Sequence, residues 1–522
     1  MKKIFSIFSA IVLLFSLTVF AIPEAEARFG GGHSSGGHSS SSHSSSSSHS
    51  SSWGGHSSSS SHSSSHSYSG SSHSSSNDDD SAFWFFFTII IIFIVLYILW
   101  VDNNQQPQTV TVKRPVKRFD ENKLITFKQI DANFSRILFL DFVHLLYVKY
   151  YSYYGKKEFD TLIPYLANSV KYDKKLDLLI NKNVIVISEI VINSVAIHLI
   201  DNVSNEDRIV VEIASNYTVH PAFYTEDSGK QHTRYTNTER WFFQREQGVL
   251  SLPPEKMQAL LCPACNAPAH FTDAGTCSSC GTMIIKGQQQ WYLKERYVVN
   301  QSLLHTVDLV AYAEETGTHL ATLYSRKLAQ EIASFEAQHH LSWTAYWNTF
   351  TQDIVKSYVV ELNAAWTQRN LNKVRHLISD RLYEANSFWM DLYKQQELHN
   401  HLDDLKIQKV ELVKIELDTY YETITVRIFA SCFDYTLDRN QNLIGGSNKK
   451  YRSYSEYWTF SRRTGVEVSQ TAPDLSVCPQ CAAPADKMGQ SAVCGYCGSK
   501  ISTGEFSWVL FLITQDENYY AG

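Results

Sequence analysis

The chain has 522 residues, more than one ordinary domain holds, which fits three or four units. Its formal net charge of −6 gives no overall basic character, which argues against nucleic acid as the main partner. Nine cysteines and an aromatic content of 13% supply the two strongest compositional signals, a possible metal chemistry and ample material for cores.

Residues 1–27 have the organisation of an export signal. Two lysines precede an apolar run that ends at Ile22, and a small-x-small tripeptide ends at Ala27. We therefore predict a signal peptide with cleavage near Ala27. Because the apolar run is slightly long for a signal, an uncleaved anchor is the alternative.

Residues 28–82 consist almost entirely of serine, glycine and histidine. Such a segment has little apolar surface to bury against the cost of ordering its backbone, so it is predicted to be a disordered tether. Its eight histidines are His33, His38, His43, His49, His56, His62, His66 and His73. Neutral imidazoles can capture zinc, nickel or copper loosely, and a plain spacer with incidental histidines is the other interpretation.

Residues 83–101 are continuously apolar and predict one transmembrane helix. Nineteen residues of helix span about 28 Å, enough for the hydrocarbon core of a bilayer. Trp84 and Trp100 lie near the two ends of the run, where interfacial aromatic residues are common.

The distribution of basic residues predicts the orientation of this helix. Residues 29–112 contain no lysine or arginine, whereas Lys113, Arg114, Lys117 and Arg118 follow in the juxtamembrane linker at 102–122. Positive residues stay on the cytoplasmic side, so the serine- and histidine-rich segment is predicted outside and everything after the span inside.

Residues 123–258 predict a first module that is built of helices followed by strands. The helices are expected near 130–170, and the strands are expected at 184–200, 208–214 and 234–243, with a fourth at 290–299. This order is typical of an α+β domain with an antiparallel sheet.

Two four-cysteine groups predict zinc ribbons within 259–300 and 474–515. Each group consists of two Cys-x-x-Cys pairs, separated by 11 and 12 residues, and the eight residues are Cys262, Cys265, Cys277, Cys280, Cys478, Cys481, Cys494 and Cys497. Four thiolates on facing hairpins suit tetrahedral zinc, and a closed four-thiolate site is structural and not catalytic. Disulfide or thioredoxin-like redox chemistry is the competing interpretation, which a reducing cytoplasm disfavours. The ribbons carry few basic residues, so nucleic acid is not expected to bind them.

Residues 301–341 are predicted to be a linker, and residues 342–473 a second α+β module. Apolar residues repeat every four positions from Phe350 to Trp366, which predicts one buried face of a long helix. A short helix near 371–378 and a third at 382–400 follow. Strands are expected at 409–417, 423–433, 454–460 and, after the second ribbon, 506–513.

The two modules are predicted to be copies of one unit. Glu239 and Trp241 lie 217 positions before Glu456 and Trp458, and the first cysteine pairs and the tryptophans that follow the ribbons repeat at offsets of 216 and 217. A constant offset over some 70 residues indicates an internal duplication. Helices packed on a curved sheet would give each copy the form of a cone with an apolar interior.

The segment 364–382, followed by strands that end in Glu-Tyr-Trp-Thr-Phe at 456–460, resembles the C-terminal domain of the mitochondrial inner-membrane translocase subunit 44 family. The resemblance covers 350–465 well and 130–245 weakly, and the ribbons and the duplication are not part of the mitochondrial protein. It implies a nuclear-transport-factor-2-like cone and a scaffolding role at a membrane, with possible lipid contact. Bacterial relatives share the layout of export signal, low-complexity stretch, span and domain.

Few other residues predict chemistry. Glu239 and Glu456 are expected either to line the cones or to pair with an arginine such as Arg462. Cys432 shares a strand face with apolar residues and is expected in the core. His399 and His401 are expected on a solvated helix end, and His339 and His340 in the linker, without an evident partner. We therefore predict that the protein is not an enzyme and has no catalytic or cofactor-binding residues besides two structural zinc sites.

The predicted function is that of a scaffold or adaptor anchored in a bacterial inner membrane, with its C-terminal modules in the cytoplasm. Its modules would bind a partner protein, an apolar ligand or a lipid. The alternative is a metal-handling or metal-sensing protein that uses the outer histidines.

Overall fold

The computed structural model describes residues 119–519 apart from 155–158, 172–185, 221–232, 258–260, 269, 273, 304–308, 310–316, 467–473, 475 and 485–491. The predicted signal peptide, the histidine-rich segment with its eight histidines, the span at 83–101 and nearly all of the juxtamembrane linker lie outside these residues. These features therefore stay predictions.

Within the described part of the chain, no helix combines the length and the apolar character that crossing a bilayer requires.

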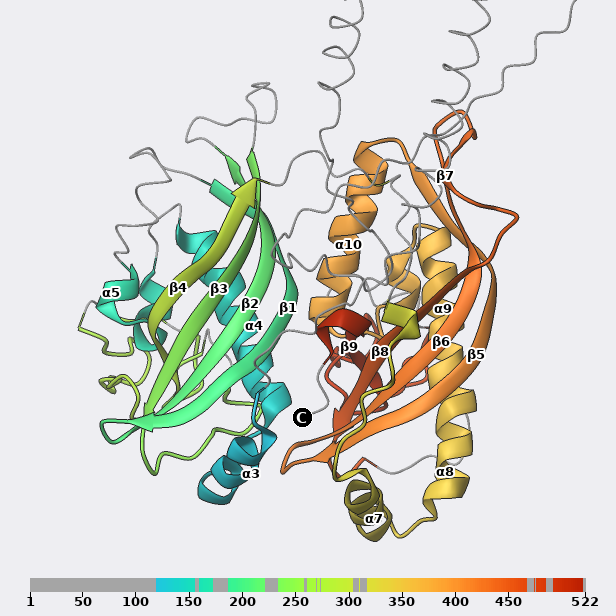
Figure 1. Ribbon diagram of the computed structural model, residues 1–522. Coiled ribbons are helices and arrows are strands. Elements are labelled where there is room, and N and C mark those ends of the chain that lie inside the picture. Colours follow the sequence, from blue (N-terminus) through green and yellow to red (C-terminus); the bar gives the residue numbers. More distant parts are fainter. Residues whose placement is uncertain are drawn as a thin grey trace, which may run out of the picture. The chain divides into compact units, whose positions relative to one another are not determined.

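The first module begins with helices and ends with a four-stranded sheet (Figure 1). Its helices are α3 (Glu121–Ile130), α4 (Arg136–Tyr154), the 3-10 turn η1 (Asp160–Tyr165) and α5 (Asn168–Lys171). The strands β1 (Val186–Val203), β2 (Glu206–His220), β3 (Thr233–Glu246) and β4 (Tyr292–Leu303) pair in sequence order, and every pairing is antiparallel. The predicted order of elements is confirmed.

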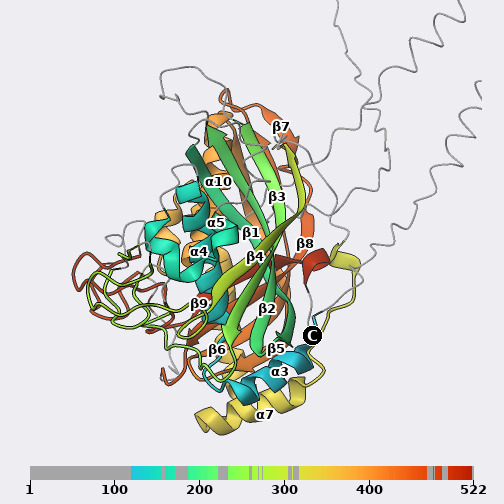
Figure 2. The same ribbon diagram turned by 90° about the vertical axis from the view of Figure 1, so that its left-hand side faces the viewer.

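Helix α4 supplies most of the first module's core. Twelve of its 19 residues are buried, because the helix is apolar nearly all round and packs on the sheet formed by β1 to β4. Figures 1 and 2 show the helix lying along one face of this strongly twisted sheet. Trp241 and Phe243 of β3 point toward it, because alternate residues of a strand share a face.

The second module has the same order of elements. Its helical part comprises α7 (Leu328–His339), α8 (Trp343–Thr349), the π-helical turn η4 (Phe350–Lys356), α9 (Ser357–Thr367), the 3-10 turn η5 (Leu371–Val374) and α10 (Asp380–Gln395), after a short turn η3 (Gly317–His319). Its sheet has the order β5 (His399–Leu417), β6 (Tyr421–Leu437), β8 (Arg452–Arg463) and β9 (Val509–Gln515), with β7 (Leu443–Gly446) paired to β6 and the turn η7 (Asp516–Asn518) at the end.

The predicted apolar face of the long helix is confirmed. Phe350, Ile354, Tyr358, Leu362 and Trp366 are all buried, and all five belong to one core cluster. The helix is continuous from α8 through α9, but its middle segment η4 is π-helical. In a π-helix each hydrogen bond spans five residues instead of four, so the turn holds about one residue more than an α-helical turn.

Three details differ from the sequence prediction. Helix α7 lies inside the stretch that was assigned to a linker. Strand β5 begins at His399, ten residues before the predicted start, so His399 and His401 lie on a strand and not on a helix end. The helix α10 ends at Gln395, because Glu397 adopts a left-handed conformation (φ 55°) that a helix cannot continue through.

Each ribbon interrupts the last hairpin of its sheet, as predicted. The chain leaves β3 or β8, forms the ribbon, and returns as β4 or β9 beside the strand that it left. Trp291 and Trp508, which precede the return strands, are both buried in the cores. The mixed helix and antiparallel-sheet fold class is thereby confirmed for both modules.

Candidate metal centres and the pocket of the second module

The first four cysteines converge on one point. Their sulfur atoms all lie within 4.8 Å of one another, and the Sγ atoms of the pairs Cys262–Cys280 and Cys265–Cys277 are each 4.0 Å apart. Two of the four, Cys262 and Cys277, are buried, and the other two are exposed. The site therefore lies at the surface of the first module with one side covered.

The second four cysteines repeat this geometry. The Sγ atoms of Cys478 and Cys497 are 3.9 Å apart, and those of Cys481 and Cys494 are 3.8 Å apart. The first cysteine of each pair is again buried and the second exposed. In both sites, therefore, the first cysteine of each Cys-x-x-Cys pair is buried and the second is exposed to solvent.

The backbone of each Cys-x-x-Cys turn is fixed by the same hydrogen bond. The N–H four residues after the first cysteine donates back to that cysteine's carbonyl, for example from Gly281 to Cys277 and from Gly498 to Cys494, both at 2.9 Å. Gly281 and Gly498 have φ of +68° and +72°, a left-handed backbone that glycine adopts without steric cost. At the equivalent place after the first pair, Asn266 and Ala482 have the same left-handed backbone.

Hydrogen bonds also favour the ionised form of some of the sulfurs, namely those of Cys277 and Cys280 in the first site and that of Cys497 in the second. The side chain and the backbone N–H of Thr282 lower the pKa of Cys280 to about 6. The side chain and backbone N–H of Ser499 lower the pKa of Cys497, likewise to about 6. Thiolates are the form that binds metal, so these hydrogen bonds favour the metal-binding form of Cys280 and Cys497.

The sulfur geometry fits tetrahedral zinc. A zinc–sulfur bond of about 2.3 Å places tetrahedral sulfurs about 3.8 Å apart, close to the separations in both sites. The same separations are about twice the length of a disulfide bond, and all nine cysteines of the chain are free thiols in the structure. Both four-cysteine clusters therefore fit zinc ribbons, and the redox interpretation gains no support.

Each ribbon is attached to its own module. In the first, Ile163 of η1 packs with Cys262 and Cys277, and the Tyr165 hydroxyl donates to the carbonyl of Leu261 at 2.5 Å. In the second, the carboxylate of Asp380 at the start of α10 accepts from Lys500 at 2.5 Å and from Ser502 at 2.9 Å. The ribbons are thus fixed to the helical layers, at 3-10 turn η1 in one case and at helix α10 in the other.

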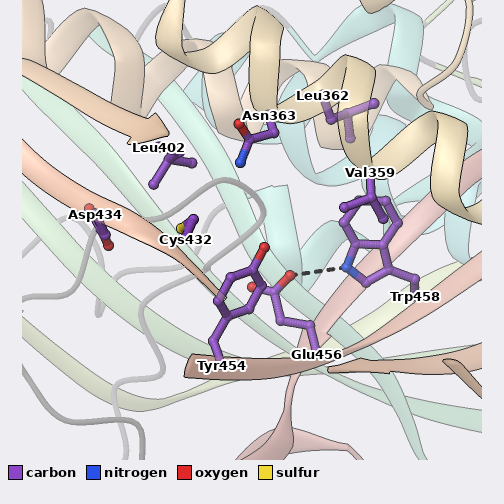
Figure 3. A pocket seen from close by; sticks show the side chains of 9 residues that line it. All are labelled: Val359, Leu362, Asn363, Leu402, Cys432, Asp434, Tyr454, Glu456 and Trp458. Carbon is purple, nitrogen blue, oxygen red and sulfur yellow. Dashed lines mark hydrogen bonds between the residues drawn. The ribbon is translucent and has the colours of Figure 1, made fainter. Parts of the chain in front are cut away.

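A pocket opens between helix α9 and the sheet of the second module (Figure 3). It encloses about 420 Å³ of empty space, counting the part open to solvent. Its lining comprises Val359, Leu362, Asn363, Leu402, Cys432, Asp434, Tyr454, Glu456 and Trp458. The helix and β5 contribute mainly apolar groups, whereas β6 and β8 contribute two carboxyl groups, a phenol and a thiol.

Both carboxylates of the pocket are held in place by neighbours. Asp434 accepts from Arg452 at 2.7 Å and from the amide of Asn400 at 2.8 Å. Glu456 accepts from the indole N–H of Trp458 and from the amide of Gln515, both at 3.0 Å. Glu456 is only 3% exposed, so these donors replace the water that it loses on folding.

Glu239 of the first module has a different set of partners. It accepts from Tyr151, Asn237 and Trp241, and it forms an ion pair with Arg296 at 2.9 Å. The two expectations for this pair of acids are therefore divided between the copies, because Glu239 pairs with an arginine whereas Glu456 lines a pocket. Arg462, which was suggested as a partner, forms its ion pair with Glu422.

The remaining sequence candidates have structural surroundings. Cys432 is buried at 1% exposure, as expected, and also lines the pocket. His339 contacts the carboxylate of Glu422 at 2.6 Å, a partner that the sequence did not indicate. His399 bonds the carbonyl of Thr367 at 2.7 Å, and His401 stacks on the ring of Tyr435.

Sequence reasoning missed Asn400, Asp434, Arg452 and Arg296. For Asp434 the one available signal was alternation, because it lies two positions from the buried Cys432 on the same strand. Arg296 gave no such signal, because Lys294 and Val298, two positions away on either side, are exposed. Alternation alone does not show which face of the strand a residue lies on in β4 and β5. The β-bulges in these strands add a residue and so reverse the alternation beyond them.

Comparison with known proteins places the second module in a family. Residues 347–473 match the Tim44-like domain. None of the curated proteins matches the chain. A solved structure described as an Ntf2 like protein involved in plasmid conjugation is similar at 10% identity and a TM-score of 0.13, over 63% of this chain and 99% of that one, a likeness too weak to carry an argument. Residues 347–473 of this chain are a domain of the Tim44-like family.

Proposed function

We propose that this protein is an adaptor anchored in a bacterial inner membrane, which presents its Tim44-like domain to a partner protein, an apolar ligand or a lipid on the cytoplasmic side. The observation that carries the proposal is the Tim44-like match at 347–473, which suggests a membrane-associated scaffolding role. The apolar run at 83–101 and the basic residues after it supply the anchor and the orientation.

The proposal includes two structural zinc ions, one in each four-cysteine site. Each closed four-sulfur site has no ligand position left for a substrate, so zinc would serve the fold and not a reaction. The contacts of Asp380 and Tyr165 with the ribbons support this role, because they join each ribbon to the helical layer of its module. Zinc would thereby stiffen the hairpin that closes each sheet.

The architecture of the modules also favours binding over catalysis. The acidic groups that line the pocket, Asp434 and Glu456, are each engaged by two hydrogen-bond donors. A general acid or base must exchange a proton with its substrate, and the donors that already bind these two carboxylates oppose such an exchange. We therefore propose a protein without enzymatic activity.

Crosslinking in native membranes tests the proposal. The full chain would carry a photoreactive amino acid in place of the exposed Val360 on α9 or, as a matched site on the first module, Tyr297 on β4. We expect the chain to stay in the membrane after carbonate extraction, and a reproducible crosslinked protein or lipid from the Val360 position. Deleting residues 83–101 should abolish both results.

Orientation is checked separately. A cysteine introduced at Ser58 should react with a membrane-impermeant maleimide in intact cells, whereas one introduced at Asn448 should react only after lysis. Release of the chain by carbonate, labelling of the Asn448 position in intact cells, or the absence of any reproducible crosslink would contradict the proposal.

A further inference from the structure

The two modules can be aligned residue by residue through equivalent contacts. Ala167 donates its N–H to the carbonyl of Leu293 at 2.9 Å, and Ser379 donates to the carbonyl of Leu510 at 3.0 Å. Isolated parallel bridges join Leu166 to Leu293 and Ile378 to Leu510 in the same way. After the long helices, residue n of the first module thus corresponds to residue n + 212 of the second, since 166 + 212 is 378.

The start of the long helices has a different offset. Phe139 contacts the rings of Trp291 and Phe243, each at 5.5 Å, and Phe350 makes the equivalent contacts with Trp508 and Phe460 at 5.3 and 5.5 Å. The offset here is 211, since 139 + 211 is 350. Between these two anchor points, the second module (350–378) therefore contains one residue more than the first (139–166).

The π-helical turn η4 is the place where that residue is accommodated. It begins at Phe350, the last position with the smaller offset, and ends at Lys356. A π-turn is the usual way in which a helix absorbs a single insertion, and such turns are frequent at functional sites. Beyond it, Val359, Leu362 and Asn363 of the second module occupy the places of Tyr147, Tyr150 and Tyr151.

The strands extend the correspondence. Ile213 pairs with Glu239 and Ile428 with Glu456, so Cys432 of β6 occupies the place of Tyr217. Trp241 pairs with Arg296 and Trp458 with Ile513, so Ile513 of β9 occupies the place of Arg296. Five positions around the buried glutamate therefore differ in size or charge between the modules.

In the first module these five side chains fill the space beside the glutamate. The ring of Tyr147 lies 4.9 Å from Trp241, Tyr150 lies 5.5 Å from Trp241, and Tyr151 stacks on Tyr217 at 5.0 Å. All four tyrosines are at most 3% exposed.

A guanidinium completes the filling. Arg296 pairs with Glu239 at 2.9 Å, and its charged group lies 5.4 Å from the ring centre of Tyr150. The first module thus places a cation of its own chain, with aromatic rings beside it, against the buried carboxylate.

The second module has smaller or uncharged residues at all five places, and four of them, Val359, Leu362, Asn363 and Cys432, line its pocket (Figure 3). Valine, leucine, asparagine and cysteine replace four tyrosines, and isoleucine replaces the arginine. The first module also shows which chemistry satisfies the shared glutamate: a guanidinium with aromatic and aliphatic neighbours. In the second module, Val359 and Leu362 line the pocket on one side of Glu456 and Tyr454 lies on the other.

We propose that the pocket of the second module is a binding site for a small alkylguanidinium or alkylammonium group, whereas the corresponding space of the first module is closed by its own side chains. The inference rests on the proposed function in that it names a ligand for an adaptor. The cationic head lies against Glu456 on the side of the pocket, while the amide of Gln515 keeps its hydrogen bond to the same carboxylate. A short alkyl chain lies against Val359, Leu362 and Leu402. The ligand is a free small cation and not an anionic lipid headgroup, because the two carboxyl groups of the lining, Asp434 and Glu456, would repel a phosphate.

Ligand-detected NMR with the full chain in zwitterionic nanodiscs tests this inference. The probes are butylguanidinium, butylammonium, 1-butanol and butyrate, with empty nanodiscs as the blank. We expect saturable binding of the two cations, at least tenfold weaker binding of butyrate, and butanol between them. Equal binding of all four probes, or saturable binding of none, would overturn the assignment.

Two substitutions restore features of the first module. Asn363→Tyr and Ile513→Arg should each weaken cation binding at least tenfold, the first by filling the space and the second by supplying a competing guanidinium. Glu456→Gln should weaken the cations at least tenfold and leave butanol within twofold. The matched control is Val360→Tyr, which adds the same ring to an exposed position of α9.

Retention of two zinc ions and an unchanged thermal unfolding midpoint show that each variant is folded. If only Ile513→Arg fails to fold, the binding site is tested by Asn363→Tyr and Glu456→Gln alone. Wild-type affinity for the cations in both of these variants would contradict the proposed site. A chain that stays anchored and crosslinks to a partner but binds no cation refutes this inference alone. A chain that binds the cation but leaves the membrane on carbonate extraction refutes the adaptor proposal instead.

Discussion

The indole N–H of Trp458 donates to the carboxylate of Glu456 at 3.0 Å, from two positions along the same face of strand β8. Trp241 donates to Glu239 in the same way on strand β3. The contact is local because side chains two residues apart in a strand lie on one face. In a Glu-x-Trp sequence on a core strand, the tryptophan indole can thus donate a hydrogen bond to the buried glutamate. This bond offsets part of the free-energy cost of burying the carboxylate.

Replacing this donor should destabilise the second module. In Trp458→Phe the ring is largely kept but Glu456 loses a hydrogen bond in a site that is 3% exposed, at a cost of about 1–3 kcal/mol. The measurement is hydrogen exchange of the β8 backbone amides, which should become faster. Tyr496→Phe, at a residue that is 61% exposed, is the control and should leave the exchange unchanged. Unchanged exchange in Trp458→Phe would show that the bond contributes nothing to stability.

The two ribbons should hold one zinc ion each. We expect two ions per purified chain by elemental analysis, one ion in Cys265→Ser or Cys481→Ser, and none in the double variant, because three thiolates and a serine no longer close the site. Cys432→Ser, which changes the cysteine outside both clusters, should retain two. A wild-type chain with far fewer than two ions, or a single variant that keeps both, would contradict the assignment.

Removing zinc should release the ribbons from the modules. The binding energy of a structural zinc ion, about 10 kcal/mol or more, is largely folding energy for so small a unit. A strong chelator should therefore expose 492–506 to proteolysis, while β5 and β6 stay protected by the core of the second module. Added zinc should reverse the effect, and a ribbon that resists protease without metal would contradict it.

Ala482 occupies a backbone conformation that favours glycine. Its φ is 57°, and a left-handed residue with a side chain costs about 1–2 kcal/mol. Ala482→Gly should therefore slow the loss of zinc from the second ribbon to a competing chelator, and Ala482→Val should accelerate it, since a β-branched residue fits this region worst. The release rate from the first ribbon in the same chain is the internal control. Equal rates in all three chains would show that the turn carries no strain.

Asp380 should make the stability of the second module depend on pH. Burial raises the pKa of its carboxyl group, but the charges of Arg375 and Lys500 outweigh it and hold the pKa below its usual range. A lowered folded-state pKa contributes stability above the unfolded value of about 3.9, and this contribution is lost as the pH falls through the folded value.

The variant Asp380→Asn isolates this contribution. Thermal unfolding midpoints measured from pH 7 to pH 3 should show a difference between wild type and variant that is constant at high pH and shrinks below about pH 4. Loss of zinc at low pH affects both chains, so the difference between them is the quantity to follow. Asp391→Asn, at an exposed acid of the same helix, is the matched control. A difference that grows toward pH 3 would contradict the assignment.

The helix and strand order of both modules was predictable because it depends on local periodicity. The four-residue repeat from Phe350 to Trp366 specifies a buried helical face whatever the partner, and alternation specifies the strands. The start of β5 was not predictable from this pattern. His399 and Asn400 are polar, and they lie in a strand because Asn400 bonds Asp434 across the sheet.

The pocket could not be predicted from either copy. It depends on which side chains of α9, β5, β6 and β8 meet around Glu456, and these residues are up to 99 positions apart, from Val359 to Trp458. His339 is a second example, because only the packing of α7 brings it to Glu422. Such contacts follow from helix and strand positions in space and leave no periodic trace in the chain.

The sequence by itself determined the two sulfur clusters, since the spacing within each Cys-x-x-Cys turn suffices to aim two thiols at one point. It also determined the α+β order of each module. Only the tertiary structure decided that Glu239 meets Arg296 whereas Glu456 faces a pocket, because the side chain that fills the space beside a buried carboxylate comes from a distant strand or helix.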